Sequence, residues 1–169
     1  METQHIENTM KEDNINIGIS NDNRQGVVSI LNNTLADQFV IYTKTRNYHW
    51  NVVGKDFYQL HVLLKEQYEA LDEAIDETAE RVRQLGGHSV GTMTEYIKMA
   101  RLQEVPGDYP NDMTMIANLV EDHESVIRTL REDANASEEK YNDIGTQDFL
   151  TELLQKHEKM AWMLRAHLE

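Results

Sequence analysis

The chain has 169 residues, of which 40% are hydrophobic and 27% charged, and its formal net charge is −14. This length allows one domain with a sizeable core. The excess of acidic residues disfavours direct nucleic-acid binding, which needs positive charge against the phosphates. The sequence contains no cysteine, which excludes disulfides, thiolate metal sites and cysteine nucleophiles.

The N-terminal segment, residues 1–24, is polar and carries more acidic than basic side chains. We expect a flexible tail there, followed by one folded domain over residues 25–169. Neither the tail nor any later segment contains an apolar run long enough for a secretory signal or a membrane span. These features predict a soluble protein of the cytoplasm.

Apolar residues recur every three or four positions through most of the domain, which indicates amphipathic helices. The first ends before a turn at Gly54, and Asp56 is a reasonable N-cap for the second. Long helices are predicted for residues 25–50, 56–85, 112–140 and 146–168, with a short helix at 94–101. We therefore expect an all-α, ferritin-like four-helix bundle with a short helix in the crossover between helices two and three.

Bundles of this kind often carry a di-iron site built from Glu-x-x-His pairs that project into the core. Only Glu2 and His5 have this spacing in the sequence, and both lie in the tail. The sequence therefore predicts no such site inside the bundle, and a metal site would have to lie elsewhere.

Two pairs of candidate ligands flank and follow the first turn. His49 and His61 lie on either side of Gly54, so an antiparallel hairpin returns them to similar heights. Asp76 and Glu80 are four residues apart and share one face of the second helix. Fifteen residues separate Asp76 from His61, which is about 22 Å along a continuous helix. The two pairs are therefore either unrelated, or they meet between two chains across a two-fold axis.

The residues around these ligands resemble the Dps family, the mini-ferritins named as DNA-binding proteins from starved cells. The similarity covers the bundle from about residue 25 to residue 169. The motifs that carry it are Tyr48-His49-Trp50-Asn51, Leu60-His61, Asp76-Glu77-Thr78-Ala79-Glu80-Arg81-Val82, Gln84-Leu85-Gly86-Gly87 and Trp162-Met163-Leu164-Arg165-Ala166.

The resemblance implies a ferroxidase centre shared between subunits of a hollow homododecamer. His49 and His61 would bind iron from one subunit, and Asp76 and Glu80 from its two-fold partner. Family members oxidise iron(II) with hydrogen peroxide or oxygen and store the ferric mineral inside, which protects the cell from oxidative damage. Imidazole and carboxylate ligands suit iron, although zinc or another metal is an alternative occupant.

One position departs from the family pattern. The fourth residue after the second histidine is often acidic in the family, whereas here it is Lys65, with Glu66 beside it but about 100° round the helix. A lysine at this position repels a second cation, so we expect a weakened second iron position.

Other polar residues have a structural interpretation beside the functional one. His49 and His61 could be interface histidines, and Asp76 and Glu80 could pair with Arg81 or Arg83. The acidic residues at the turn between the last two helices could line a pore for iron(II) or form a solvated surface; they are Glu132, Asp133, Glu138, Glu139 and Asp143. His123 and His157 have no converging partner in the sequence, so we expect structural or surface roles for them.

Three classes of function follow. An iron-oxidising storage shell requires His49, His61, Asp76 and Glu80. A DNA-binding protein is disfavoured by the net charge and the acidic tail. A catalytically silent helical shell remains open because of Lys65. The motif order favours the iron-oxidising shell.

Overall fold

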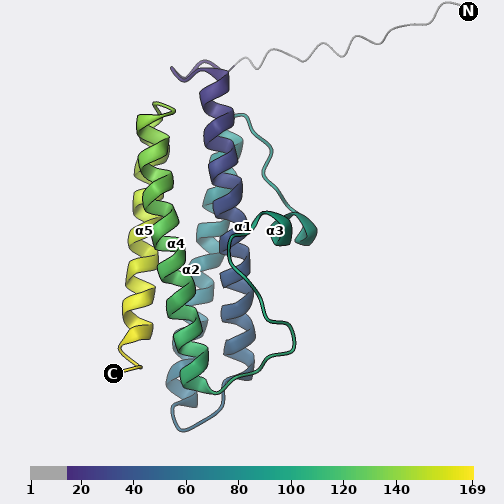
Figure 1. The fold of residues 1–169 in the computed structure, drawn as a ribbon, viewed down its shortest axis with the longest axis vertical. Helices are drawn as coiled ribbons and strands as arrows, with labels where there is room; N and C mark the ends of the chain where they lie inside the picture. Colours follow the sequence, from purple (N-terminus) through teal and green to yellow (C-terminus); the bar gives the residue numbers. More distant parts are fainter. Residues whose placement is uncertain (1–14) are drawn as a thin grey trace, which may run out of the picture.

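The computed structural model describes residues 15–169, which form four long helices packed side by side and one short helix beside them (Figure 1). The helices are α1 (Asn21–Asn51), α2 (Phe57–Gln84), α3 (Met93–Met99), α4 (Asp112–Glu139) and α5 (Ile144–Arg165). The prediction of an all-α ferritin-like bundle is confirmed. Residues 1–14, with Glu2, His5 and most of the predicted tail, lie outside the described part of the chain.

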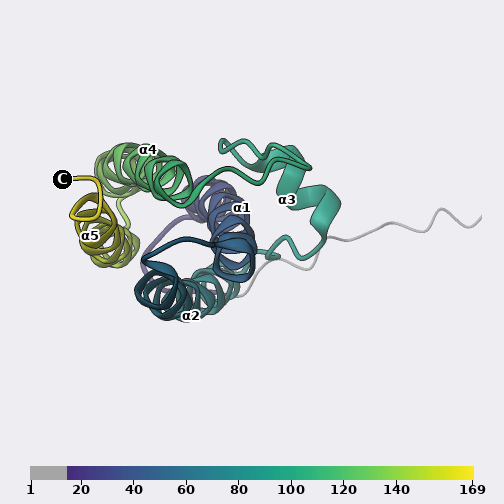
Figure 2. The same ribbon diagram turned by 90° about the horizontal axis from the view of Figure 1, so that it is seen from below.

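The bundle consists of two antiparallel hairpins, α1–α2 and α4–α5. The crossover between them, residues 85–111, runs back along the bundle from the end of α2 to the start of α4 and carries α3 (Figure 1). The end-on view places α3 outside the four-helix packing, against α1 (Figure 2). Across residues 15–169, each helix is too short or too polar to cross a membrane.

Helix α1 begins at Asn21, four residues before its predicted start. The Ser20 side chain caps this end by accepting a hydrogen bond from the Asn23 amide at 3.3 Å. Arg24 is buried in the first turn, where its Nε donates to the Leu85 carbonyl at 3.2 Å. The extra turn is polar, so an apolar repeat could not reveal it.

The turn between α1 and α2 depends on Gly54. Helix α1 ends at Asn51, followed by extended backbone at Val52. Gly54 has a φ of +129°, a conformation that L side chains rarely adopt. A Cβ there would also lie 2.6 Å from Asp112 Oδ2. Glycine at this position therefore permits the tight turn that leads from α1 into α2.

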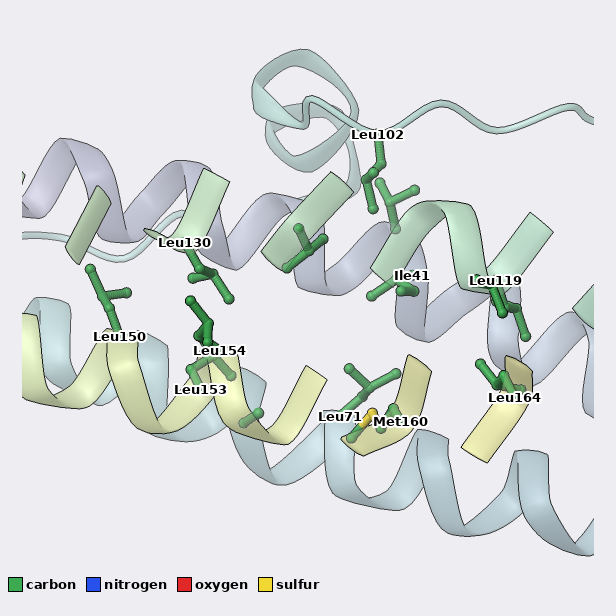
Figure 3. Close-up of a cluster of buried hydrophobic side chains, with 14 of the residues drawn as sticks. Ile41, Leu71, Leu102, Leu119, Leu130, Leu150, Leu153, Leu154, Met160 and Leu164 are labelled. Atoms are coloured by element: carbon green, nitrogen blue, oxygen red, sulfur yellow. The ribbon is translucent and has the colours of Figure 1, made fainter. Parts of the chain in front are cut away.

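Leucine, isoleucine and methionine side chains from all four long helices fill the core (Figure 3). Leu71 of α2 lies against Met160 of α5, while Leu130 of α4 faces Leu150 of α5 (Figure 3). Burying each such side chain stabilises the fold by about 1.5–3 kcal/mol. Leu102 of the crossover also belongs to this core, so the crossover is tied to the bundle.

A buried carboxylate anchors the crossover. Asp37 of α1 is 1% exposed and accepts hydrogen bonds from the Arg101 amide at 2.6 Å and the Leu102 amide at 3.3 Å. The Arg101 side chain adds an ion pair at 2.7 Å. Removing Asp37 would leave buried donors without an acceptor.

We expect Asp37→Ala to lower the free energy of unfolding by about 2–3 kcal/mol, because it breaks this buried hydrogen-bonded pair. Urea unfolding at a fixed protein concentration measures the change. Asp148→Ala removes an exposed carboxylate on α5 and should change stability by less than about 0.5 kcal/mol. Equal effects of the two substitutions would contradict the anchoring role.

Candidate metal centre

The α1–α2 hairpin brings His49 and His61 into contact. His49 lies in the last turn of α1, and His61 lies near the start of α2. Their ring centroids are 3.8 Å apart, with 20° between the ring planes. The prediction that the hairpin returns these two residues to the same height is confirmed.

Each imidazole is oriented by the backbone of the other histidine. His49 Nδ1 lies 2.7 Å from the His61 carbonyl oxygen, and His61 Nδ1 lies 2.9 Å from the His49 carbonyl oxygen. A carbonyl oxygen can only accept, so each Nδ1 carries a proton and donates it. When the rings are neutral, both Nε2 atoms therefore present lone pairs, the form in which histidine binds a metal.

The surroundings favour the neutral form of His49. Burial lowers the pKa of His49 below its ordinary value; the hydrogen bond to the His61 backbone opposes this, and the charges of His61, Lys65 and Arg46 lower the pKa further. The Tyr68 ring packs edge-on to His49 at 5.2 Å. The Arg46 guanidinium lies over the Tyr68 ring at 5.0 Å, which holds its charge beside the histidines.

The two predicted carboxylate ligands lie further along α2. Asp76 and Glu80 are exposed, and neither has a hydrogen bond or ion pair within residues 15–169. The alternative that they pair with Arg81 or Arg83 does not hold in this chain. Arg81 binds Asp143 at 3.3 Å, and Arg83 binds the backbone just after the end of α2.

The structure does not bring the histidines and these carboxylates together within one chain. Helix α2 is continuous from Phe57 to Gln84, so His61 and Asp76 are separated by about 22 Å. Nowhere in the described chain do three or more histidine and carboxylate side chains converge to hold a metal ion. One chain thus contains two separate half-sites.

A hollow of about 570 Å³ lies beside Asp76. Glu69, Asp72 and Glu73 of α2 line one side, and Tyr96 lies on the other. Several carboxylates around one concave surface create a negative potential that attracts cations. The carboxylate half-site therefore lies in an environment suited to collecting metal ions.

Large apolar side chains are exposed near both half-sites. Trp50 and Tyr58, beside the histidines, are 63% and 73% exposed, and Met93 and Ile97 of α3 are 68% and 69% exposed. Helix α3 adjoins the hollow that contains Asp76. Exposed apolar side chains that gather in one area are typical of surfaces that contact another protein chain.

Lys65 lies one turn after His61 on α2. Its ammonium group is 3.5 Å from Glu69 Oε1, and the lysine side chain is 54% exposed. Its charge is one of the influences that lower the pKa of His49. The positive charge of Lys65 therefore acts on the histidines, while the weakened second iron position stays a prediction.

The acidic residues at the α4–α5 turn divide into two groups. Asp133 binds Arg101 at 3.0 Å, and Asp143 is buried as the N-cap of α5. The remaining three carboxylates are exposed and have no partner within residues 15–169; they are Glu132, Glu138 and Glu139. Only these three are free to face a pore.

The expectation that His123 and His157 lack a converging partner is wrong. Both are buried between α4 and α5, and their Nδ1 atoms are 2.9 Å apart. Each histidine occupies a core position of its helix, four residues after a buried leucine. The spacing from the leucines was visible in the sequence and indicates a core position. The sequence does not show which residues of α4 and α5 lie opposite each other.

Known proteins share this architecture. The ferritin-like domain family model matches residues 28–169. A low temperature-induced protein of Nostoc is 50% identical over 155 residues, covering 92% of this chain and 87% of that protein. A DNA protection during starvation protein of Helicobacter pylori is 35% identical over 139 residues, covering 82% of this chain and 96% of the relative.

The structure of DpsC from Streptomyces coelicolor matches with a TM-score of 0.88 at 32% identity, covering 92% of this chain and 90% of the other. The chain belongs to the ferritin-like family and, within it, to the Dps proteins. Membership of the Dps family supports a general role in iron storage and protection. It also supports assembly from several copies of the chain, which agrees with the exposed apolar surfaces of this Dps chain.

Proposed function

We propose that this protein oxidises iron(II) at a ferroxidase centre shared between two subunits and stores the ferric product inside a hollow dodecamer. The observation that carries the proposal is that the candidate ligands of one chain lie in two separate pairs. One chain orients two imidazole Nε2 atoms at one end of α2 and leaves two unpaired carboxylates about 22 Å away. Two antiparallel copies of α2 would join each half-site to its complement.

The proposed ligands of the iron(II) substrate are His49 and His61 of one subunit with Asp76 and Glu80 of the partner subunit. Imidazole nitrogen and carboxylate oxygen together suit iron(II). The backbone carbonyls that accept from both Nδ1 atoms keep the rings in place without using the ligating nitrogens. This arrangement requires no rotation of either ring before the metal binds.

The chemistry transfers electrons from bound iron(II) to a peroxide or dioxygen co-substrate. Each iron(II) ion gives one electron and becomes iron(III). Reduction of one hydrogen peroxide to two water molecules takes two electrons and two protons, so two iron(II) ions are consumed. Completing both electron transfers at one place avoids release of a hydroxyl radical, and this would account for protection.

Negative surfaces give iron(II) a route to the centre and the interior. The hollow beside Asp76 lies at the proposed centre itself. Glu132, Glu138 and Glu139 are free at the α4–α5 turn, where related subunits would form pores. A net charge of −14 concentrates cations around the whole assembly.

Direct DNA binding is less well supported. The chain has 16 basic against 30 acidic residues. Several exposed cations are also bound to acidic neighbours, as in Arg131–Glu158 at 2.9 Å and Lys156–Glu77 at 2.8 Å. The acidic excess disfavours contact with phosphates, so we propose that protection comes from iron chemistry.

We expect the double substitution Asp76→Ala/Glu80→Ala to slow peroxide-driven iron(II) oxidation by about 100-fold, because it removes half of the ligands. The measurement adds iron(II) anaerobically, then a pulse of peroxide, and follows ferric absorbance. Light scattering checks that the assembly keeps its size.

The matched control is Glu121→Ala/Glu152→Ala, which removes two exposed carboxylates from α4 and α5. This control should oxidise iron(II) at the wild-type rate, since it loses the same charge from residues that are not proposed ligands. Equal and slow oxidation in wild type, variant and control would reject the ferroxidase proposal.

Lys65 provides a second test of the same centre. We expect Lys65→Asp to increase the iron(II) bound before oxidation, because it replaces a repelling cation with a carboxylate one turn from His61. Anaerobic titration calorimetry measures the number of ions per chain. Lys159→Asp makes the same charge change at an exposed position on α5 and should leave the number unchanged. No difference between the two variants would show that Lys65 does not limit iron binding.

A further inference from the structure

The interior of the bundle contains polar side chains at mid-length. His123 of α4 and His157 of α5 are 0% and 1% exposed, and Gln67 of α2 is 3% exposed. The Gln67 amide donates to the Met160 carbonyl at 3.2 Å, which places it one turn from His157 along α5. The surrounding core is apolar, with Met160 and Leu153 on α5 and Leu119 on α4 (Figure 3).

The two histidines share one proton between their Nδ1 atoms. At 2.9 Å, one Nδ1 donates and the other accepts. Two neutral rings carry two ring protons in total, so the second proton lies on the Nε2 of the accepting ring. Neither His123 Nε2 nor His157 Nε2 has a hydrogen-bond partner in the described chain. A third proton therefore adds to the Nε2 of the donating ring, where it finds no hydrogen-bond acceptor, and a fourth takes the Nδ1 lone pair that accepts the shared bond.

No opposite charge faces this pair. Gln67 of α2, which contacts α5 one turn from His157, is neutral, and so is Gln38, the buried glutamine of α1. The charged residues beside each histidine in sequence are all bound in ion pairs, of which Asp122–Lys44 is largely buried and the other three are more exposed. These ion pairs are Asp122–Lys44 at 2.5 Å, Glu124–Arg165 at 2.7 Å, Lys156–Glu77 at 2.8 Å and Glu158–Arg131 at 2.9 Å.

We propose that the His123–His157 pair is an acid-sensitive switch in the bundle core. It holds α4 against α5 while both rings are neutral, and it releases them when each ring takes up one additional proton. The first added proton leaves a positive charge in an apolar interior, and the second occupies the accepting Nδ1 lone pair and so breaks the N–H···N bond. Opening of the hairpin returns both rings to water, where they accept protons freely.

The charge preferences of the two rings agree with this geometry. Burial lowers the pKa of His157 to about 4, and burial together with His157 holds the pKa of His123 well below its ordinary value. A histidine in the unfolded chain has a pKa of about 6.5. The stability that the neutral histidine pair contributes is fully present above pH 6.5. It is lost as the pH falls toward 4, because the unfolded chain binds more protons than the folded chain.

Urea unfolding of the assembled protein between pH 7.5 and 4.5 tests the switch. The pair should raise the unfolding equilibrium constant by about 100-fold per pH unit below 6.5, since two protons are taken up. His157→Gln should reduce this contribution to about tenfold, and His123→Gln/His157→Gln should abolish it. Glutamine keeps a polar side chain in the core but does not titrate.

The control is His88→Gln, which alters an exposed histidine that contacts Arg83. It should follow the wild-type pH dependence, and the acidic residues common to all variants cancel in the comparison. If the double variant does not fold, carbon-13 histidine NMR of the wild type decides the question. Rings of His123 and His157 that titrate near pH 6.5 in the folded assembly would overturn the proposal, as would a double variant with the wild-type pH dependence. Rings that stay neutral until the assembly opens would support it.

Discussion

A continuous helix sets the distance between the two halves of the proposed metal centre. Helix α2 carries His61 near its start and Asp76 about 22 Å further along, and nothing within the described chain shortens that distance. Both half-sites also have features that only a second chain would complete. The imidazole Nε2 atoms have no carboxylate near them, and the carboxylates have no cation. The proposed oxidation therefore requires assembly, because only two chains together supply all four proposed ligands.

In ferritin-like di-iron proteins the metal ligands lie inside the bundle, whereas in this chain the proposed ligands lie at its surface. The Glu-x-x-His pairs that hold metals inside such bundles are missing, and the core holds a neutral histidine pair instead. Without carboxylates, a divalent ion in that core would carry uncompensated charge. The carboxylates lie outside, on the exposed face of α2. The bundle interior is thus free to respond to protons while the proposed oxidation takes place between subunits.

Much of this arrangement could be predicted from residue spacing. The apolar repeat located the four long helices, and the positions of His49 and His61 around Gly54 predicted their contact. The distance between His61 and Asp76 predicted that the two pairs of side chains do not meet within one chain, because helix rise is constant. These predictions succeeded because each depends on local geometry along one helix or one turn.

Other features depend on contacts between distant segments and could not be read from spacing. Asp37 binds a crossover residue 64 positions away, and no local pattern links the two. The His123–His157 bond requires the register between α4 and α5, which the turn at Asp143 sets. The protonated Nδ1 atoms at the metal centre follow from two carbonyl oxygens whose directions only the folded hairpin defines.

The most direct test of the shared centre is complementation between two inactive variants. One variant carries His49→Ala/His61→Ala, and the other carries Asp76→Ala/Glu80→Ala. In a mixed pair, one site loses all four ligands and the other keeps all four. Because half of randomly formed pairs are mixed, co-assembly should restore about a quarter of the wild-type rate of iron(II) oxidation. A co-assembled protein with no more activity than either variant alone would contradict a centre shared between subunits.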